Sequence, residues 1–141
     1  MTPIDIAISG EPRPKGSMRG FAMRSKSGKY TARLTHDNAK TKPWQKQVEA
    51  GIRAAMEALD IDQPIDEPVS VSAMFFMTKP KSVRRSFPST KPDLDKLQRV
   101  IGDALEGTLL TNDSRIIVWR VGKLYGDEPG VHITVEGIDD E

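Results

Sequence analysis

The chain has 141 residues, 37% of them hydrophobic and 29% charged, which fits one globular domain with its own core. It has no cysteine and two histidines, which excludes disulfide frameworks, thiolate zinc sites and cysteine nucleophiles and disfavours histidine-based metal sites and Ser-His-Asp triads. No apolar run approaches 18 residues and the N-terminus lacks a signal-peptide pattern, so we expect a soluble, cytoplasmic protein without a membrane partner.

The net charge of +1 hides a strong segregation of charge along the chain. Residues 13–46 carry ten basic residues and one acid, and residues 79–91 carry five basic residues and no acid. Residues 127–141 carry six acids and no Lys or Arg. Each basic segment alone is adequately explained as a solvated loop. Together, the two segments could form one surface that binds a polyanion such as DNA.

The N-terminal half predicts a strand, a hairpin, a helix and a second strand. Alternating apolar residues predict a strand over 3–9, and a basic-tipped hairpin is expected with strands 21–24 and 29–34. This hairpin belongs to a basic arm, residues 13–35, which we expect to be mobile without a ligand. A helix is predicted over 43–59 from the core-facing spacing of Trp44, Val48 and Ile52, followed by a central strand over 69–77.

The C-terminal half predicts one helix and two strands. Residues 91–107 show an apolar helical face and end at Gly107, a common helix terminator. A strand is expected over 115–125, with Ile117, Trp119 and Val121 on one face, and a last strand over 131–135 is expected to pair with it as a hairpin. The acidic tail, residues 137–141, is expected to fray. The fold class is therefore α+β, a single domain over 1–141 with about two main helices packed on a mixed sheet.

Two carboxylates, Asp93 and Asp95, stand at the start of the helix predicted within 91–107. Because residues two apart diverge by about 200° in a helix, they can converge if Asp93 is the N-cap or precedes it, which Pro92 favours. One interpretation is helix capping and dipole compensation. The other is a site for Mg²⁺ or Mn²⁺, because these ions take one or two protein carboxylates together with water and phosphate.

Further charged residues favour the metal interpretation. Asp113 precedes the 115–125 strand, Arg99 lies one turn beyond Asp95, and Lys96 is three residues after Asp93. Three carboxylates with a neighbouring cation and two basic segments suggest metal-assisted phosphodiester hydrolysis. Asp103 lies two turns further along and is expected to pair with Arg99.

The stretch from Lys91 to Gly107, followed by Asn112-Asp113 and a strand bearing Lys123, resembles the RusA-type Holliday junction resolvases. The Gly10 to Gly16 stretch, Gly-Glu-Pro-Arg-Pro-Lys-Gly, is similar to phage members of that family. The resemblance implies a Mg²⁺-dependent (alternatively Mn²⁺-dependent) homodimeric endodeoxyribonuclease, without a small-molecule cofactor, that nicks two strands of a four-way junction symmetrically.

The resemblance also implies the residues that form the site. The expected metal-site residues are Asp93, Asp95 and Asp113, and the catalytic set adds Arg99 and Lys96. Eleven basic residues are the candidates for DNA binding: Arg13, Lys15, Arg19, Arg24, Lys26, Lys29, Lys81, Arg84, Arg85, Lys91 and Lys123.

Two positions depart from the family pattern, since Lys96 replaces an Asn and Arg99 replaces the catalytic Lys. Arginine can stabilise negative charge but cannot donate a proton at working pH. Lys96 could take over the lysine's role, or it could weaken metal binding. A catalytically weakened protein that binds branched DNA is therefore one alternative. Another is a nucleotide-sugar transferase, a class that also uses Asp-x-Asp, although the chain lacks a nucleotide-binding βαβ segment.

Overall fold

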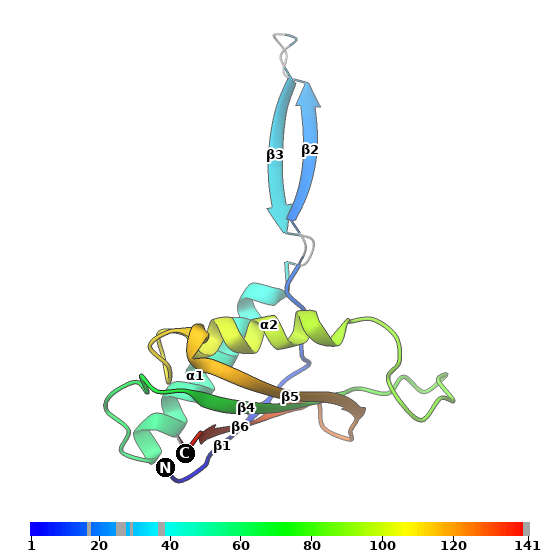
Figure 1. Cartoon of the computed structure of the whole chain (residues 1–141). Helices are drawn as coiled ribbons and strands as arrows, with labels where there is room; N and C mark the ends of the chain where they lie inside the picture. Colours follow the sequence, from blue (N-terminus) through cyan, green and yellow to red (C-terminus); the bar gives the residue numbers. More distant parts are fainter. Residues whose placement is uncertain (17, 25–27, 29, 37–38, 140–141) are drawn as a thin grey trace.

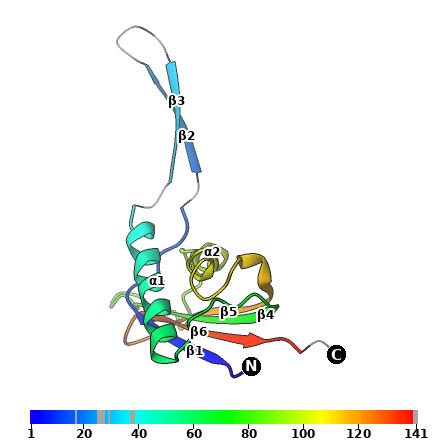
Figure 2. The same ribbon diagram turned by 90° about the vertical axis from the view of Figure 1, so that its left-hand side faces the viewer.

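The computed structural model describes residues 1–16, 18–24, 28, 30–36 and 39–139. Four strands form one sheet: β1 (Ile4–Ser9), β4 (Val69–Met77), β5 (Ile116–Tyr125) and β6 (Gly130–Gly137). Two helices, α1 (Thr41–Ala58) and α2 (Leu94–Leu105), cover one face of this sheet, with α1 over β1 and α2 over β5 (Figures 1 and 2). The predicted α+β class with two main helices on a mixed sheet is confirmed.

The order of the strands corrects one sequence expectation. The sheet order is β1-β6-β4-β5, so β5 and β6 are not a hairpin pair. β6 lies antiparallel between β1 and β4, with Ile133 opposite both Ile6 and Ala73. β5 instead runs parallel to β4, with Val121 opposite Ala73. The continuously apolar β4 is therefore central, and β5 is an edge strand.

A register shift in β5 corrects a second expectation. Val69 pairs with Ile116 and Ser70 pairs with Val118, which leaves Ile117 without a partner on β4. The side chain of Ile117 is 60% exposed, whereas Trp119 and Val121 pack against the core. Because a bulge inserts one extra residue, it changes the face on which the side chains before it lie. Trp119 and Val121 therefore share the core face, as predicted, but Ile117 does not.

The core lies between the sheet and the helices. Helix α1 begins at Thr41, two residues before the predicted start, and its buried stripe contains Trp44, Val48 and Ile52, as the spacing predicted. The buried face of α2 includes Leu97, Ile101 and Leu105. These side chains anchor α2 from its first turn to its last, which fixes the position of the charged residues at its exposed start.

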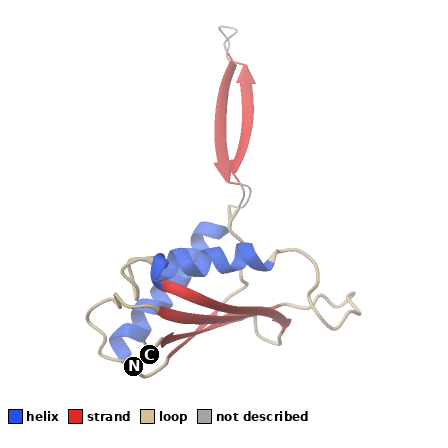
Figure 3. Cartoon of the chain, in the orientation of Figure 1, coloured by secondary structure: helices blue, strands red, loops and turns tan. Residues whose placement is uncertain are grey.

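The N-terminal hairpin consists of β2 (Met18–Arg24) and β3 (Tyr30–His36), both longer than the sequence indicated. It stands away from the sheet and helices (Figure 3). No helix within the described residues is long and apolar enough to cross a membrane.

Candidate active site

The start of α2 presents two exposed carboxylates. Asp93 is the N-cap residue, with an extended backbone (φ −68°, ψ 138°), and its carbonyl accepts from the amides of Lys96 and Leu97 at 3.1 Å each. Its side chain makes no capping hydrogen bond, and Asp95 follows in the first helical turn. The expected placement of both residues is confirmed. Since the Asp93 carboxylate is not used as a side-chain cap, it remains available to a ligand.

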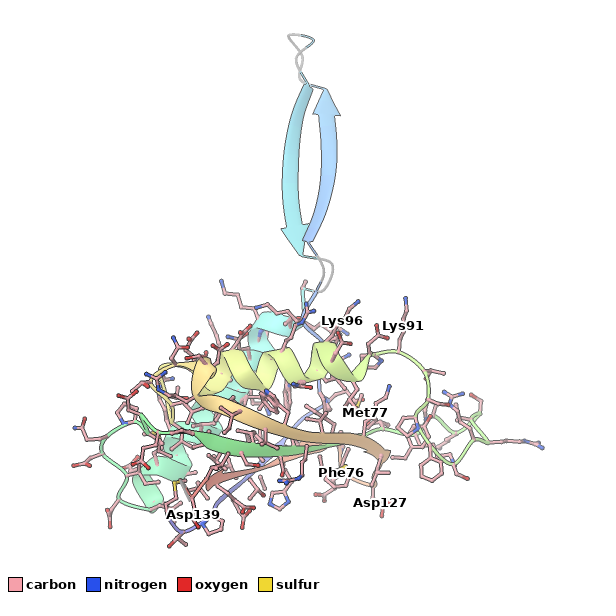
Figure 4. All side chains as sticks on the ribbon, viewed as in Figure 1. Phe76, Met77, Lys91, Lys96, Asp127 and Asp139 are labelled. Carbon is pink, nitrogen blue, oxygen red and sulfur yellow. The ribbon has the colours of Figure 1, made fainter. Side chains whose placement is uncertain are left out.

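Each of these carboxylates has a cationic neighbour on the same helix. Lys96 Nζ lies 3.7 Å from Asp93 Oδ2, and an Arg99 guanidinium nitrogen lies 3.9 Å from Asp95 Oδ2. The Asp93 and Asp95 side chains are 51% and 66% exposed, so solvent screens both pairs and each contributes little to folding stability. Figure 4 shows Lys96 beside Lys91 at this end of α2. The cations are therefore free to exchange a carboxylate partner for a phosphate.

The segment that follows β1 lies along α2 and brings basic residues to it. The amide of Lys15 donates to the carbonyl of Lys96 at 3.0 Å, and Lys15 Nζ lies 3.1 Å from Asp103 Oδ2. Asp103 therefore pairs with Lys15, and the expected pairing with Arg99 is wrong. The physical reason is that the fold supplies a closer cation from a segment distant in sequence, while Arg99 turns toward Asp95.

A pocket of about 330 Å³ opens beside Asp93. Five of the residues that line it are charged: Glu11, Arg13, Lys91, Asp93 and Lys96. Glu11, which the sequence reasoning missed, accepts hydrogen bonds from Thr78 Oγ1 at 2.7 Å and from the Thr78 amide at 3.4 Å. The sequence signal for Glu11 was weak, because it is one acid in a loop of prolines and cations. The mixture of three cations and two acids suits a phosphate and a hard metal ion together.

Lys123 reaches from β5 to the segment that enters α2. Its ammonium donates to the carbonyls of Thr90 at 2.6 Å and Pro92 at 2.7 Å. Charge-assisted bonds of this length are strong, so Lys123 holds the backbone immediately before Asp93. In this structure Lys123 therefore positions one of the candidate metal ligands.

Asp113 lies at the opposite end of α2, in the short 3₁₀ helix η1 (Asp113–Arg115). Its amide faces Glu106 Oε1 at 3.4 Å, and Glu106 is eleven residues beyond Asp95, or about 16 Å at 1.5 Å per residue. Within the described ranges, no three acidic or histidine side chains lie close enough to hold a metal ion. A single chain therefore brings Asp93 and Asp95 to one helix end but does not bring Asp113 to them.

The position of Asp113 is fixed by a second acidic residue that the sequence reasoning missed. Asp66 accepts from Thr111 Oγ1 at 2.5 Å and from the Arg115 guanidinium at 2.9 and 3.0 Å. The hydrogen bonds from Thr111 and Arg115 and the positive charge of Arg115 lower the pKa of the Asp66 carboxyl. Asp66 therefore ties η1 itself, through Arg115, and the segment just before it, through Thr111, to the loop before β4.

The other predicted DNA-binding residues fall into two groups. Lys81, Arg84 and Arg85 are exposed on the loop between β4 and α2. Arg19 and Arg24 lie in β2, and Lys26 and Lys29 lie outside the described residues. The basic loop and the Arg13 segment thus flank the start of α2, while β2 lies further from it (Figure 1).

The amino-acid sequence of the chain matches a known protein family. The family model described as Endodeoxyribonuclease RusA matches residues 10–136, most of the chain. The chain belongs to the RusA family. The uncharacterized protein YqaN of Bacillus subtilis (strain 168) is 30% identical over 151 residues, and the alignment covers 96% of each protein.

RusA proteins are endodeoxyribonucleases, so the chain is a nuclease that acts in DNA recombination. The family resolves Holliday junctions, acts on branched DNA and generally depends on a divalent metal ion. The two exposed carboxylates at the start of α2 fit this requirement, since Mg²⁺ is commonly held by one or two protein carboxylates together with substrate phosphate and water.

Proposed function

We propose that this RusA protein resolves four-way DNA junctions by Mg²⁺-dependent, paired symmetrical nicks, acting as a homodimer. The observation that carries the proposal is the exposed Asp93 and Asp95 pair, flanked by Lys96, Arg99 and the basic pocket. The pocket and the basic loop offer cations to the phosphates on either side of a cut.

The roles of the residues follow from their positions. Asp93 and Asp95 would hold the metal ion, which when bound polarises the scissile phosphate and lowers the pKa of a bound water. Arg99 stays charged at any working pH and would stabilise the charge that builds on the phosphate oxygens. Lys123 keeps the backbone before Asp93 in place, and Arg13 contributes a cation to the lining of the pocket.

The position of Asp113 supports a dimer with a shared site. Helix α2 and β5 run in opposite directions. Lys123, near the end of β5, donates to the Pro92 carbonyl just before α2, and η1, at the start of β5, contacts the end of α2. Within the described residues, one edge of β5 carries no partner strand. Antiparallel pairing of two β5 edges about a two-fold axis would place Asp113 of one copy at the same end as Asp93 and Asp95 of the other.

Replacing Lys96 tests whether its ammonium competes with the metal ion. Lys96→Asn restores the family residue and removes a positive charge 3.7 Å from Asp93 Oδ2. A charge pair at this distance is worth about 1 kcal/mol in water, so we expect the Mg²⁺ concentration for half-maximal cleavage to fall about fivefold. The measurement is a Mg²⁺ titration of junction cleavage. An unchanged or raised half-maximal concentration would show that Lys96 does not compete with the metal ion, and a lower cleavage rate at saturating Mg²⁺ would show that Lys96 aids catalysis.

Arg13 is the cleaner probe of the basic pocket, since Lys15 is already paired with Asp103. We expect Arg13→Gln to weaken junction binding and to reduce the slope of log K against log salt by about one, because each phosphate contact releases about one counterion. Fluorescence anisotropy at several salt concentrations gives both values. Arg53→Gln, at an exposed position of α1 outside both basic segments, is the matched control. If Arg13→Gln changes the slope no more than this control, the assignment of Arg13 to phosphate binding is wrong.

The proposed function is tested by comparing substrates of the same sequence. The wild-type protein should nick a synthetic four-way junction in Mg²⁺ and leave a linear duplex of one arm intact. Junction binding without nicking, in either Mg²⁺ or Mn²⁺, would support the weakened DNA-binding alternative. Equal cleavage of the duplex would contradict the junction specificity.

A further inference from the structure

The loop between β4 and α2, residues 78–93, carries an unusually exposed aromatic side chain. Phe87 is 65% exposed, the largest exposed fraction among the large hydrophobic residues whose burial the structure describes. A single exposed apolar residue needs no explanation by itself. Phe87 differs from a scattered surface residue in its charged surroundings and in its position close to the candidate metal site in the chain.

The residues around Phe87 are cationic. Lys81, Arg84 and Arg85 are all exposed on the same loop, and residues 79–91 contain no acid. Such a combination of cations and an exposed ring is how proteins hold unpaired bases, since the cations follow the backbone and the ring stacks on a base. It also resembles the apolar wedges that proteins insert between base steps of kinked DNA.

The loop is anchored rather than loose at its ends. At its start Thr78 Oγ1 donates to Glu11 Oε2 at 2.7 Å, and within the loop Arg85 donates to Thr90 Oγ1 at 3.2 Å. On the other side, Pro88 next to Phe87 is buried, and Lys123 Nζ donates to the Thr90 carbonyl at 2.6 Å. Phe87 is therefore presented to solvent by a loop that is tied to the protein on both sides of it.

The loop also places Phe87 within reach of the candidate metal site. Phe87 precedes Asp93 by six positions, so their Cα atoms lie at most about 20 Å apart. The loop extends beyond the end of the sheet at the start of α2 (Figure 1). This span corresponds to a few base pairs of DNA. A ring at this distance can contact the branch point of a junction whose phosphodiester lies at Asp93.

We infer that Phe87 stacks on a nucleobase at the branch point of the junction, and that Arg84 and Arg85 hold the flanking phosphates. The inference rests on the proposed function, because it requires branched DNA at the start of α2. Bases at a branch point are stacked less securely than bases within a duplex, so extracting one costs less. Phe87 is thereby a residue that favours junctions over duplex DNA.

The test measures binding in an Asp95→Asn background, in which the DNA stays uncut, with 2-aminopurine placed at the branch point. Phe87→Ala should weaken junction binding about tenfold, in line with the stacking free energy of one base, and leave duplex binding unchanged. The rise in 2-aminopurine emission on binding, which reports a base leaving its neighbours, should disappear. Phe87→Trp should restore both signals because the larger ring also stacks.

The controls separate stacking from general effects on the surface. Leu59→Ala removes another exposed apolar side chain, 54% exposed and located after α1, and should change neither signal. Equal junction affinity and equal emission for wild type and Phe87→Ala would overturn the inference. If wild-type protein cleaves junctions while Phe87→Ala binds them normally, the proposed function stands and the stacking role alone is wrong.

Discussion

Asp95→Asn should abolish junction cleavage while leaving junction binding nearly intact. The change removes one negative charge from an exposed side chain in the first turn of α2, so the fold should tolerate it, with a change in unfolding free energy within about 0.5 kcal/mol. Loss of one preorganised electrostatic partner of a transition state typically costs 10²–10³ in rate, and loss of a metal ligand should cost at least about a hundredfold. Initial cleavage rates and anisotropy titrations on the same junction measure the two effects.

The matched control for this variant is Asp62→Asn, which removes one exposed carboxylate from the loop between α1 and β4. It should cleave junctions at the wild-type rate. If Asp95→Asn cleaves within a few fold of wild type, Asp95 does not hold the metal ion, and the assignment of the start of α2 as the active site is wrong.

Mixed dimers of Asp95→Asn and Asp113→Asn should regain activity that both parental homodimers lack. In the shared-site arrangement, each site takes Asp95 from one chain and Asp113 from the other. One site of the mixed dimer therefore contains both substitutions, and the other site contains the native Asp95 and the native Asp113. The mixed dimer should therefore nick junctions at about half the wild-type rate, with single nicks in place of paired ones. Co-expression with two different affinity tags, followed by purification on both, isolates the mixed species for the cleavage assay.

The control for this experiment is a mixed dimer of Asp93→Asn and Asp95→Asn. Both changes then lie at the start of α2, so each site carries one defect and the dimer should stay inactive. An Asp95→Asn and Asp113→Asn mixture as inactive as this control would show that each chain builds its own site. Recovery of no doubly tagged species would show that the protein does not form the dimer at all.

The start of α2 could be predicted from sequence because its determinants are local. Pro92 restricts the backbone before Asp93, and the apolar spacing from Leu94 to Leu105 sets the buried face of the helix. The N-cap position of Asp93 and the first-turn position of Asp95 follow from those two features. The same local reasoning predicted the buried stripe of α1.

The features that could not be predicted depend on contacts between distant segments. The pairing of β5 with β4 depends on sheet order, which alternating residues do not reveal, and the bulge at Ile117 changed the expected face. Asp103 meets Lys15 because residues 11–15 lie along α2. The separation of Asp113 from Asp95 follows from the opposite directions of α2 and β5. These directions depend on contacts between the two elements in the folded chain and not on local sequence patterns.

Paired nicking of a four-way junction can be measured on a supercoiled plasmid that extrudes a cruciform. A first nick releases the supercoiling and lets the cruciform collapse, so linear plasmid forms when both cuts occur within one bound complex. We predict that the wild-type protein in Mg²⁺ converts the plasmid to the linear form, with nicks at matching positions on opposite strands. Accumulation of nicked circles without linear product, or no cleavage at all, would show that the protein does not cut a junction by paired nicks.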